Sequence, residues 1–232
     1  MNEELDFCII ITTYNRPDML YKLLDDIQSK KNNYKIKIFI FNDGSTKNYD
    51  LSEFDVTHLR FFPNRGKKKY WEIVNQTFNI VKSIKSKYYL YLPDDVSLVD
   101  DFFNEVIRVY TMIDDNNKIC LNILTDGRVD RTNWTNFKSI HYDEYIKTQW
   151  NDLCFLAKSD FFLKLNYIIN PIPLSRWNGN PNLSSGVGQQ ISLRLYNMGL
   201  NMYHTKNSFV YHGNHESKMN KTERNINNLT TK

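Results

Sequence analysis

The chain has 232 residues, of which 41% are hydrophobic and 14% aromatic, enough for one domain with a sizeable core. A net charge of +4 does not by itself indicate nucleic-acid binding, and three scattered cysteines argue against a disulfide framework or a zinc site. The acidic start MNEELD is unlike a secretory leader, and no apolar run approaches the roughly 20 residues that span a bilayer. We therefore expect a soluble, cytoplasmic protein.

Strand-like and helical patterns alternate over the first 125 residues or so. Continuous runs of apolar and β-branched residues are typical of strands covered on both faces, and apolar residues at helical spacing follow them. The strands are expected at 7–11, 35–43, 58–64, 88–95 and 118–126, with helices starting near 17, 68 and 102. This alternation predicts an α/β domain with a mainly parallel central sheet flanked by helices.

The second half of the chain is less regular, and residues 130–150 are aromatic and polar. The expected elements are a strand and a short helix within 152–165, a long loop at 170–188, a helix at 187–198 and two short strands at 200–205 and 208–212. The aromatic residues suit stacking on sugar rings and equally on bases.

Asp94 and Asp95 directly follow the apolar strand YYLYL. Adjacent carboxylates raise each other's pKa, so both stay ionised under burial only beside a counter-charge. A divalent cation supplies that charge, and hard oxygen ligands suit Mg²⁺ or Mn²⁺, which then bridge a diphosphate. The alternative interpretation is a solvated helix start.

Two other strand ends carry polar residues that suit a ligand. In the stretch NDGS, the Asp43 carboxylate is suited to accept hydrogen bonds from a ligand's N–H groups, although an Asx-turn explains it equally simply. In TTYNRP, the Tyr14 ring can stack on a base and Arg16 can face phosphate, and the alternative is an ordinary capped helix start.

Two further stretches are weaker signals. In NRGKKKYW, Gly66 permits close backbone approach and Lys67, Lys68 and Lys69 add positive charge, although a solvated basic turn has the same sequence. His212 ends the last expected strand, where a neutral imidazole can complete a metal shell with carboxylates or serve only a structural role.

Taken in order, these stretches resemble the GT-A nucleotide-sugar glycosyltransferases, in particular the large family 2 group. That group opens with a strand leading into a TYNR turn and helix, and its next two strands end in xDGS and NxG turns. A DxD-type metal motif, a helix carrying SLRL and a histidine after the last strand come later. The matching stretches here are 9–20, 42–45, 64–66, 92–96, 192–199 and 210–217.

The resemblance implies a GT-A (Rossmann-like) fold and metal-dependent transfer of a sugar from a nucleotide-diphosphate sugar, usually a UDP-sugar, to an acceptor hydroxyl. Asp43 would hold the base, and Asp95 and His212 would bind Mn²⁺ or Mg²⁺. Pro93 stands where many members have the first acidic residue of the metal motif, which leaves two carboxylates for one ion. The implied nucleotide-sugar ligands are Thr13, Tyr14, Arg16, Asp43, Asn64, Gly66, Lys69 and Asp94.

The general base is the main departure from the family pattern. The family's base lies in an acidic pair just before SLRL, where this chain has Val187 and Gly188. We expect Asp152 to replace it, with Glu216 as the second candidate, unless the reaction retains configuration and needs no such base.

We expect residues 1–127 to form the nucleotide-sugar-binding half and 128–217 the acceptor-side half of one domain, followed by a flexible polar tail at 218–232. Two acceptor classes stay open: a glycan of a polysaccharide, glycolipid or glycoprotein, and a hydroxymethylated pyrimidine in DNA, as phage-type enzymes use. Because the acidic pair is missing, a third interpretation is a GT-A domain that binds nucleotide sugar without catalysis.

Overall fold

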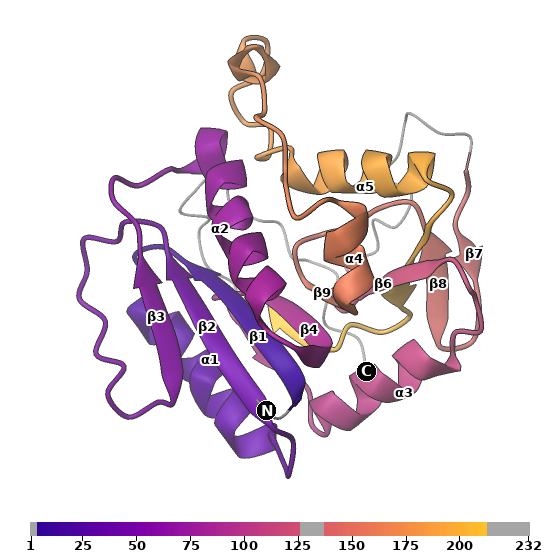
Figure 1. Ribbon diagram of the computed structural model, residues 1–232, viewed down its shortest axis with the longest axis horizontal. Coiled ribbons are helices and arrows are strands. Elements are labelled where there is room, and N and C mark those ends of the chain that lie inside the picture. The colour runs from indigo at the N-terminus through magenta and orange to yellow at the C-terminus, as the bar shows by residue number, and fades with distance from the viewer. Residues whose placement is uncertain (1–3, 126–136, 213–232) are drawn as a thin grey trace.

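Strands from both halves of the chain pair in one sheet of nine strands (Figure 1). The computed structural model describes residues 4–125 and 137–212. The strands are β1 (Leu5–Thr13), β2 (Ile36–Asn42), β3 (Val56–Arg60), β4 (Ser86–Pro93), β6 (Lys118–Asn122), β7 (Ile140–His141), β8 (Tyr145–Thr148), β9 (Phe155–Ala157) and β10 (Asn201–Thr205). Their order across the sheet is β3-β2-β1-β4-β9-β6-β10-β8-β7.

The first four strands are parallel, as the alternating pattern predicts, and so is the pair β6 and β10. β9 lies between β4 and β6 and runs antiparallel to both. The sheet is therefore mainly parallel and continuous across the two halves of the sequence, which matches the GT-A expectation.

Helices cover both faces of this sheet. One face packs against α1 (Pro17–Lys30) and α3 (Phe102–Met112). The other packs against α2 (Tyr70–Ser83), α4 (Ser159–Lys164) and α5 (Val187–Asn197), and α2 and α4 lie in front of the sheet in Figure 1. Two short 3₁₀ helices are η1 (Lys67–Lys69) and η2 (Leu174–Trp177), and η2 belongs to the orange excursion at the top of Figure 1.

The sequence pattern explains the first unit of the fold. Residues Phe7–Ile11 of β1 are all buried, as a strand covered on both faces requires. In α1 the residues at helical spacing, Leu20, Leu23, Leu24 and Ile27, form the buried stripe, and Pro17 occupies the first turn, where no N–H partner is needed.

A second, two-stranded sheet completes the site edge. β5 (Val96–Leu98) follows β4 after a two-residue turn and pairs antiparallel with β11 (Val210–His212). The sequence pattern did not predict β5, β7 or β8, and the third strand ends at Arg60 rather than near residue 64. Pro63 has no backbone N–H with which to continue the ladder.

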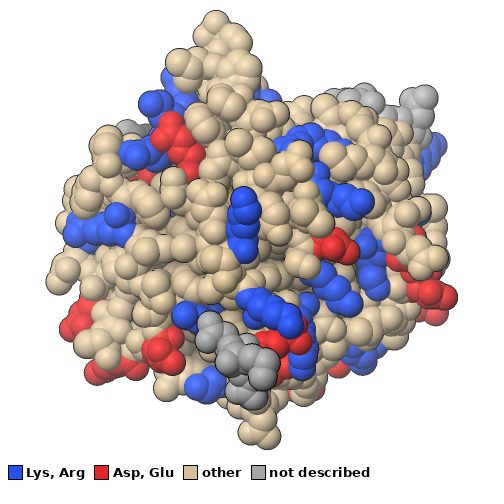
Figure 2. Space-filling model, viewed as in Figure 1, with Lys and Arg blue, Asp and Glu red and all other residues tan. Residues whose placement is uncertain are grey.

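The three cysteines, Cys8, Cys120 and Cys154, are free and buried. Within the described ranges, no helix is both long and apolar enough to cross a membrane. On the face shown in Figure 2, Lys and Arg side chains are spread in small groups with Asp and Glu among them. That face carries no continuous basic stripe.

Candidate active site

The acidic pair Asp94-Asp95 lies in the turn between β4 and β5, at the carboxyl end of the parallel strands. The β5–β11 register places His212 opposite Val96. As a result, the Nε2 atom of His212 lies 3.2 Å from Oδ1 of Asp95, and both side chains are buried. Strand pairing between distant parts of the chain thus brings an imidazole to the acidic pair.

Arg16, which directly precedes α1, supplies a counter-charge to both carboxylates. Its Nη1 atom lies 3.2 Å from Asp94 Oδ1 and also binds Asp95 Oδ2. Thr13 Oγ1 donates a 2.6 Å hydrogen bond to Asp94 Oδ2. Burial, and then the Asp95 charge, raise the pKa of Asp94 to about 6, although Arg16 and Thr13 act to lower it. One guanidinium therefore does not fully offset two buried carboxylates.

The donors of this cluster fit a hard divalent cation. Carboxylate oxygens are the ligands that Mg²⁺ and Mn²⁺ prefer, and a neutral imidazole can complete the shell. Asp94 Oδ1 and Asp95 Oδ2 converge on one point, and Nη1 of Arg16 fills that point. Among residues 4–125 and 137–212, no three His, Cys, Asp or Glu side chains are grouped as a ready-made metal site. The donor atoms and their position at the strand ends thus suit a divalent cation, and the cation that contacts the two carboxylates is the Arg16 guanidinium.

Asp43 follows β2, and its carboxylate accepts three hydrogen bonds from the turn after β3. The backbone N–H of Arg65 donates to Oδ1 at 2.7 Å, while the N–H of Gly66 and the amide of Asn64 donate to Oδ2 at 3.0 and 2.9 Å. Burial raises the pKa of Asp43, and the two backbone donors oppose that shift. The carboxylate fixes the 64–66 turn beside the site, and its contact with a base stays a prediction.

Gly44 lets the NDGS turn approach the segment after β3. Its φ is +69°, and a Cβ atom there would lie 2.6 Å from the Asn64 nitrogen and 2.8 Å from the Phe61 oxygen. Both the backbone conformation and the lack of space require glycine. The Asn-Asp-Gly turn is therefore a packing element of the site wall.

Tyr49, in the loop after β2, ties the first two turns together. Its hydroxyl lies 3.0 Å from Thr13 Oγ1, accepts the Arg16 backbone N–H at 2.8 Å and accepts the Ser45 hydroxyl at 3.3 Å. Asn15 Oδ1 also accepts two backbone N–H groups from the segment after Ser45. Sequence reasoning did not single out Tyr49, because a tyrosine in an irregular loop belongs to no periodic pattern.

The remaining nucleotide-side candidates lie around these turns. Tyr14 is half-buried, and its backbone N–H is hydrogen-bonded to Asp94. Lys69 is exposed, with its Nζ atom 3.9 Å from Glu72 Oε1. Lys67 instead donates a 2.6 Å hydrogen bond to the Pro181 carbonyl, which links this turn to the 171–185 excursion.

Asp152 lies in the loop that leads to β9, against the first turn of α5. Its backbone N–H donates to Asn122 Oδ1 at 3.0 Å, at the end of β6. A Cβ atom at Gly188 would lie 2.7 Å from the Asn151 carbonyl oxygen, and Val187 is buried in the core. The 150–152 loop therefore occupies the space beside α5 that a side chain at position 188 would need.

The pKa of the buried Cys154 thiol responds to charges from both this loop and the acidic pair. Burial raises its pKa well above the usual value, and the charges of Asp152 and Asp95 raise it further. Both carboxylates therefore act on the same thiol.

The model of the family described as glycosyl transferase family 2 matches residues 8–163, which is most of the chain. The chain belongs to glycosyl transferase family 2. The matched residues include the TYNR, NDGS, NRG and PDD stretches and Asp152, whereas α5 and His212 follow them. No curated protein sequence matches the chain significantly.

Solved structures resemble this family 2 chain in fold. S. aureus TarS 1–349 aligns with a TM-score of 0.59 at 12% identity, covering 90% of this chain and 61% of TarS 1–349. The same TarS region in complex with UDP-GlcNAc has a TM-score of 0.58, also at 12% identity, with coverages of 98% and 62%. A mannosyltransferase, PcManGT from Pyrobaculum calidifontis, in complex with GDP-Man and Mn²⁺, has a TM-score of 0.51 at 11% identity, with coverages of 87% and 55%.

At these identities the solved structures establish the GT-A fold alone. The chain spans less than two thirds of the length of each of these proteins.

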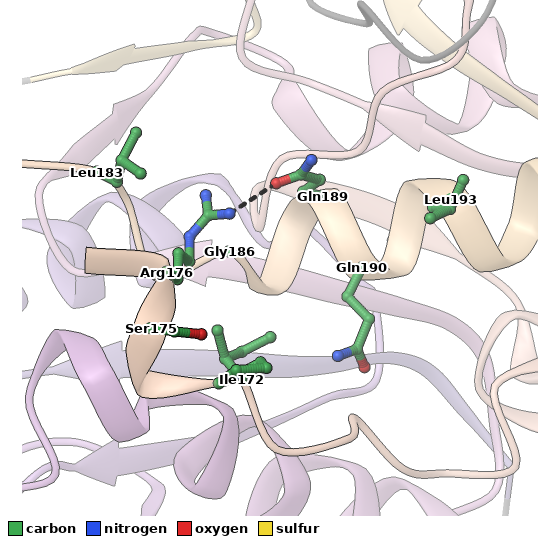
Figure 3. Close-up of a pocket in the computed structure, with 9 residues that line it drawn as sticks. Ile172, Ser175, Arg176, Leu183, Gly186, Gln189, Gln190 and Leu193 are labelled. Atoms are coloured by element: carbon green, nitrogen blue, oxygen red, sulfur yellow. Dashed lines mark hydrogen bonds between the residues drawn. The ribbon is translucent and has the colours of Figure 1, made fainter. Parts of the chain in front are cut away.

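An open pocket of about 480 Å³ lies beside α5, within the half of the chain expected to bind the acceptor (Figure 3). Its walls are the start of α5 and the 172–183 segment, with apolar side chains from Ile172, Leu183 and Leu193. Arg176 lies at the α5 end, where it donates a 2.9 Å hydrogen bond to Gln189 Oε1, the dashed line in Figure 3. The pocket is therefore mostly apolar with one cation at its edge.

The structure brings most of the predicted site residues to one edge of the sheet and leaves others apart. Lys69 points toward solvent, and Glu216 lies outside the described residues. The side chains in direct mutual contact are Thr13, Arg16, Asp94, Asp95 and His212 in one cluster, and Asp43, Asn64 and the Gly66 backbone in a second.

Proposed function

We propose that this family 2 glycosyltransferase moves a sugar from a nucleoside diphosphate sugar, with UDP as the nucleotide, to an acceptor hydroxyl in a reaction that depends on Mn²⁺ or Mg²⁺. The observation that carries the proposal is the buried Asp94-Asp95 pair at the carboxyl edge of the parallel sheet, with His212 against it. Ligands of open α/β sheets bind at this edge. A diphosphate adds negative charge to two carboxylates, so binding it there requires cations.

The nucleotide side of the proposal uses the two turns joined by Tyr49. Tyr14 offers a ring for stacking on uracil, and Asp43 and its turn form the wall beside the base. Thr13 and Asp94 lie where the ribose and the diphosphate would follow. The further ligands in this proposal are Arg16, Asn64, Gly66 and Lys69.

Asp95 and His212 would hold the divalent cation. When bound, the ion neutralises the charge that develops on the leaving diphosphate. His212 Nε2 lies 3.2 Å from Asp95 Oδ1, and both side chains are buried. The surrounding fold therefore orients both side chains before a ligand binds.

Asp152 is the proposed general base for an inverting transfer. Its carboxylate takes the proton of the acceptor hydroxyl while the acceptor oxygen bonds to the anomeric carbon and the bond from that carbon to the diphosphate breaks. The nucleoside diphosphate leaves with the electron pair of the broken bond. The proposal rests on the position of Asp152 in the loop before β9, where its neighbour Asn151 packs against the first turn of α5.

The test is UDP release from UDP-sugars in the presence of Mn²⁺. We expect release to stop on chelation, and we expect Asp95→Ala and His212→Ala to abolish Mn²⁺-dependent UDP binding. Asp100→Ala, an exposed aspartate after β5, is the matched control. UDP binding that does not depend on Mn²⁺, or that is unchanged by both substitutions, would refute the metal assignment. If the protein binds UDP but does not cleave UDP-sugars to release UDP, it is a binding domain and not an enzyme.

Asp152→Asn should lower the turnover rate by about 10²- to 10⁴-fold and leave UDP affinity unchanged, because a general base acts on the acceptor and not on the nucleotide. Asp160→Asn, an exposed aspartate on α4, is the control. An unchanged rate in Asp152→Asn would exclude this residue as the base.

The acceptor is proposed to be a saccharide hydroxyl, reached from the mostly apolar pocket beside α5. A DNA acceptor requires an extended basic face instead. Salt-dependent retention on hydroxymethylated DNA, above that on unmodified DNA, would instead favour the modified base.

A further inference from the structure

Arg16 holds the point at which the two carboxylates of the acidic pair converge. Its Nη1 atom contacts Asp94 Oδ1 at 3.2 Å and Asp95 Oδ2 on the neighbouring residue. The exposed fractions of the three side chains are 10% for Arg16, 7% for Asp94 and 4% for Asp95. In the absence of other cations, this guanidinium is what makes the burial of two adjacent carboxylates tolerable.

The backbone of Arg16 is fixed independently of this ion pair. Its N–H donates to the Tyr49 hydroxyl at 2.8 Å, and the next residue, Pro17, starts α1. The Tyr49 hydroxyl also contacts Thr13, so the whole turn is held from the loop after β2. The contacts that hold the backbone of this turn therefore do not involve the guanidinium.

A divalent cation held by Asp95 and His212 would share the Asp95 carboxylate with the guanidinium, because His212 Nε2 lies 3.2 Å from Oδ1 and Arg16 Nη1 binds Oδ2. Two positive groups on one buried carboxylate repel each other, so entry of the ion weakens the contact between Arg16 and Asp95. A diphosphate offers the displaced guanidinium a new anionic partner, with the bidentate geometry that arginine prefers.

We propose that Arg16 is an internal counter-cation of the acidic pair that leaves Asp95 and transfers to the diphosphate when metal and nucleotide bind. The inference rests on the proposed function and adds that metal and nucleotide bind cooperatively. The metal binds weakly alone and tightly together with the nucleotide. Arg16 thus couples the two ligands.

The experiment measures Mn²⁺ affinity by the electron paramagnetic resonance signal of the free ion, which does not depend on activity. Without nucleotide, Arg16→Gln should bind Mn²⁺ at least about 10-fold more tightly than the wild type. With Mn²⁺ saturating, the same variant should bind UDP about 10-fold more weakly. Arg108→Gln is the control, because Arg108 also pairs with two carboxylates, Glu105 and Glu144, but on the surface.

The outcomes separate the inference from the function. If the wild type binds UDP with Mn²⁺ and Arg16→Gln gains no Mn²⁺ affinity without nucleotide, the inference alone is wrong. If no form binds Mn²⁺ with or without UDP, the metal assignment and the inference both fail. If Arg16→Gln is unfolded, recovery of its folded state by Mn²⁺ supports the inference, since the ion replaces the missing cation, and no recovery contradicts it.

Discussion

The Asp43 carboxylate holds a neighbouring turn of the candidate site in place. It accepts two backbone N–H groups and one side-chain amide from the 64–66 turn, so its first effect is to hold that turn in place. The NDGS motif predicts both a turn and a ligand-binding carboxylate at this position. The motif does not specify which partner the carboxylate takes, because the donors come from a turn that follows the next strand.

Asp43→Ala should lower the free energy of unfolding by about 2 kcal/mol, since three donors lose their acceptor, and should also weaken UDP binding. Denaturant unfolding and UDP titration measure the two effects. Asp55→Ala, an exposed aspartate before β3, should change stability by less than about 0.5 kcal/mol. Loss of UDP affinity with full stability would instead assign the carboxylate directly to the base.

At the scale of elements, the first turn of α5 packs against the 150–152 loop. The contact depends on the absence of a side chain at Gly188, because the Asn151 carbonyl occupies that space. Asn151 N–H also donates to the Ser192 hydroxyl at 2.8 Å, and that hydroxyl donates to the Gly188 carbonyl at 2.7 Å. Helix and loop thus form one packed unit.

Gly188→Ala should destabilise the protein by about 1–3 kcal/mol, because a Cβ atom 2.7 Å from backbone oxygen forces the loop away from the helix. Denaturant unfolding measures the loss. Gly179→Ala, where a Cβ atom meets nothing within 4 Å, is the matched control and should be near neutral. Equal effects of the two substitutions would contradict the packing argument.

The long elements could be predicted from the sequence, and the short ones could not. Helices such as α1 and α2 have a periodic apolar stripe, and β1 and β4 have long apolar runs. β5 has only three residues, and its pairing with β11 depends on contacts between segments about half the chain apart, for which no local pattern exists. For the same reason the sequence did not predict that Arg16 would fill the space between Asp94 and Asp95.

At the scale of the molecule, the two expected halves share one sheet. β9, from the second half, fills the position between β4 and β6, both from the first. β11 likewise completes the small sheet that begins at β5. The two halves of the sequence are therefore joined in one hydrogen-bonded structure.

A fragment of residues 1–127 should not fold, because β4 and β6 would each lose the strand that separates them. Circular dichroism and a thermal melt measure this, with the full chain as reference, whose melt should be a single cooperative transition. A fragment with its own cooperative melt and UDP affinity would show that the first half is an autonomous domain.

The buried cysteines have a consequence for how such a fold can be followed in solution. Cys8 lies in β1 and Cys120 in β6, and burial raises the pKa of each thiol to about 12. A thiol with so high a pKa reacts with a disulfide reagent only after the strand that carries it is exposed to water. The rate at which a disulfide reagent modifies Cys8 and Cys120 therefore measures how often the centre of the sheet opens. The decrease of that rate on addition of nucleotide measures how far the nucleotide stabilises the closed sheet.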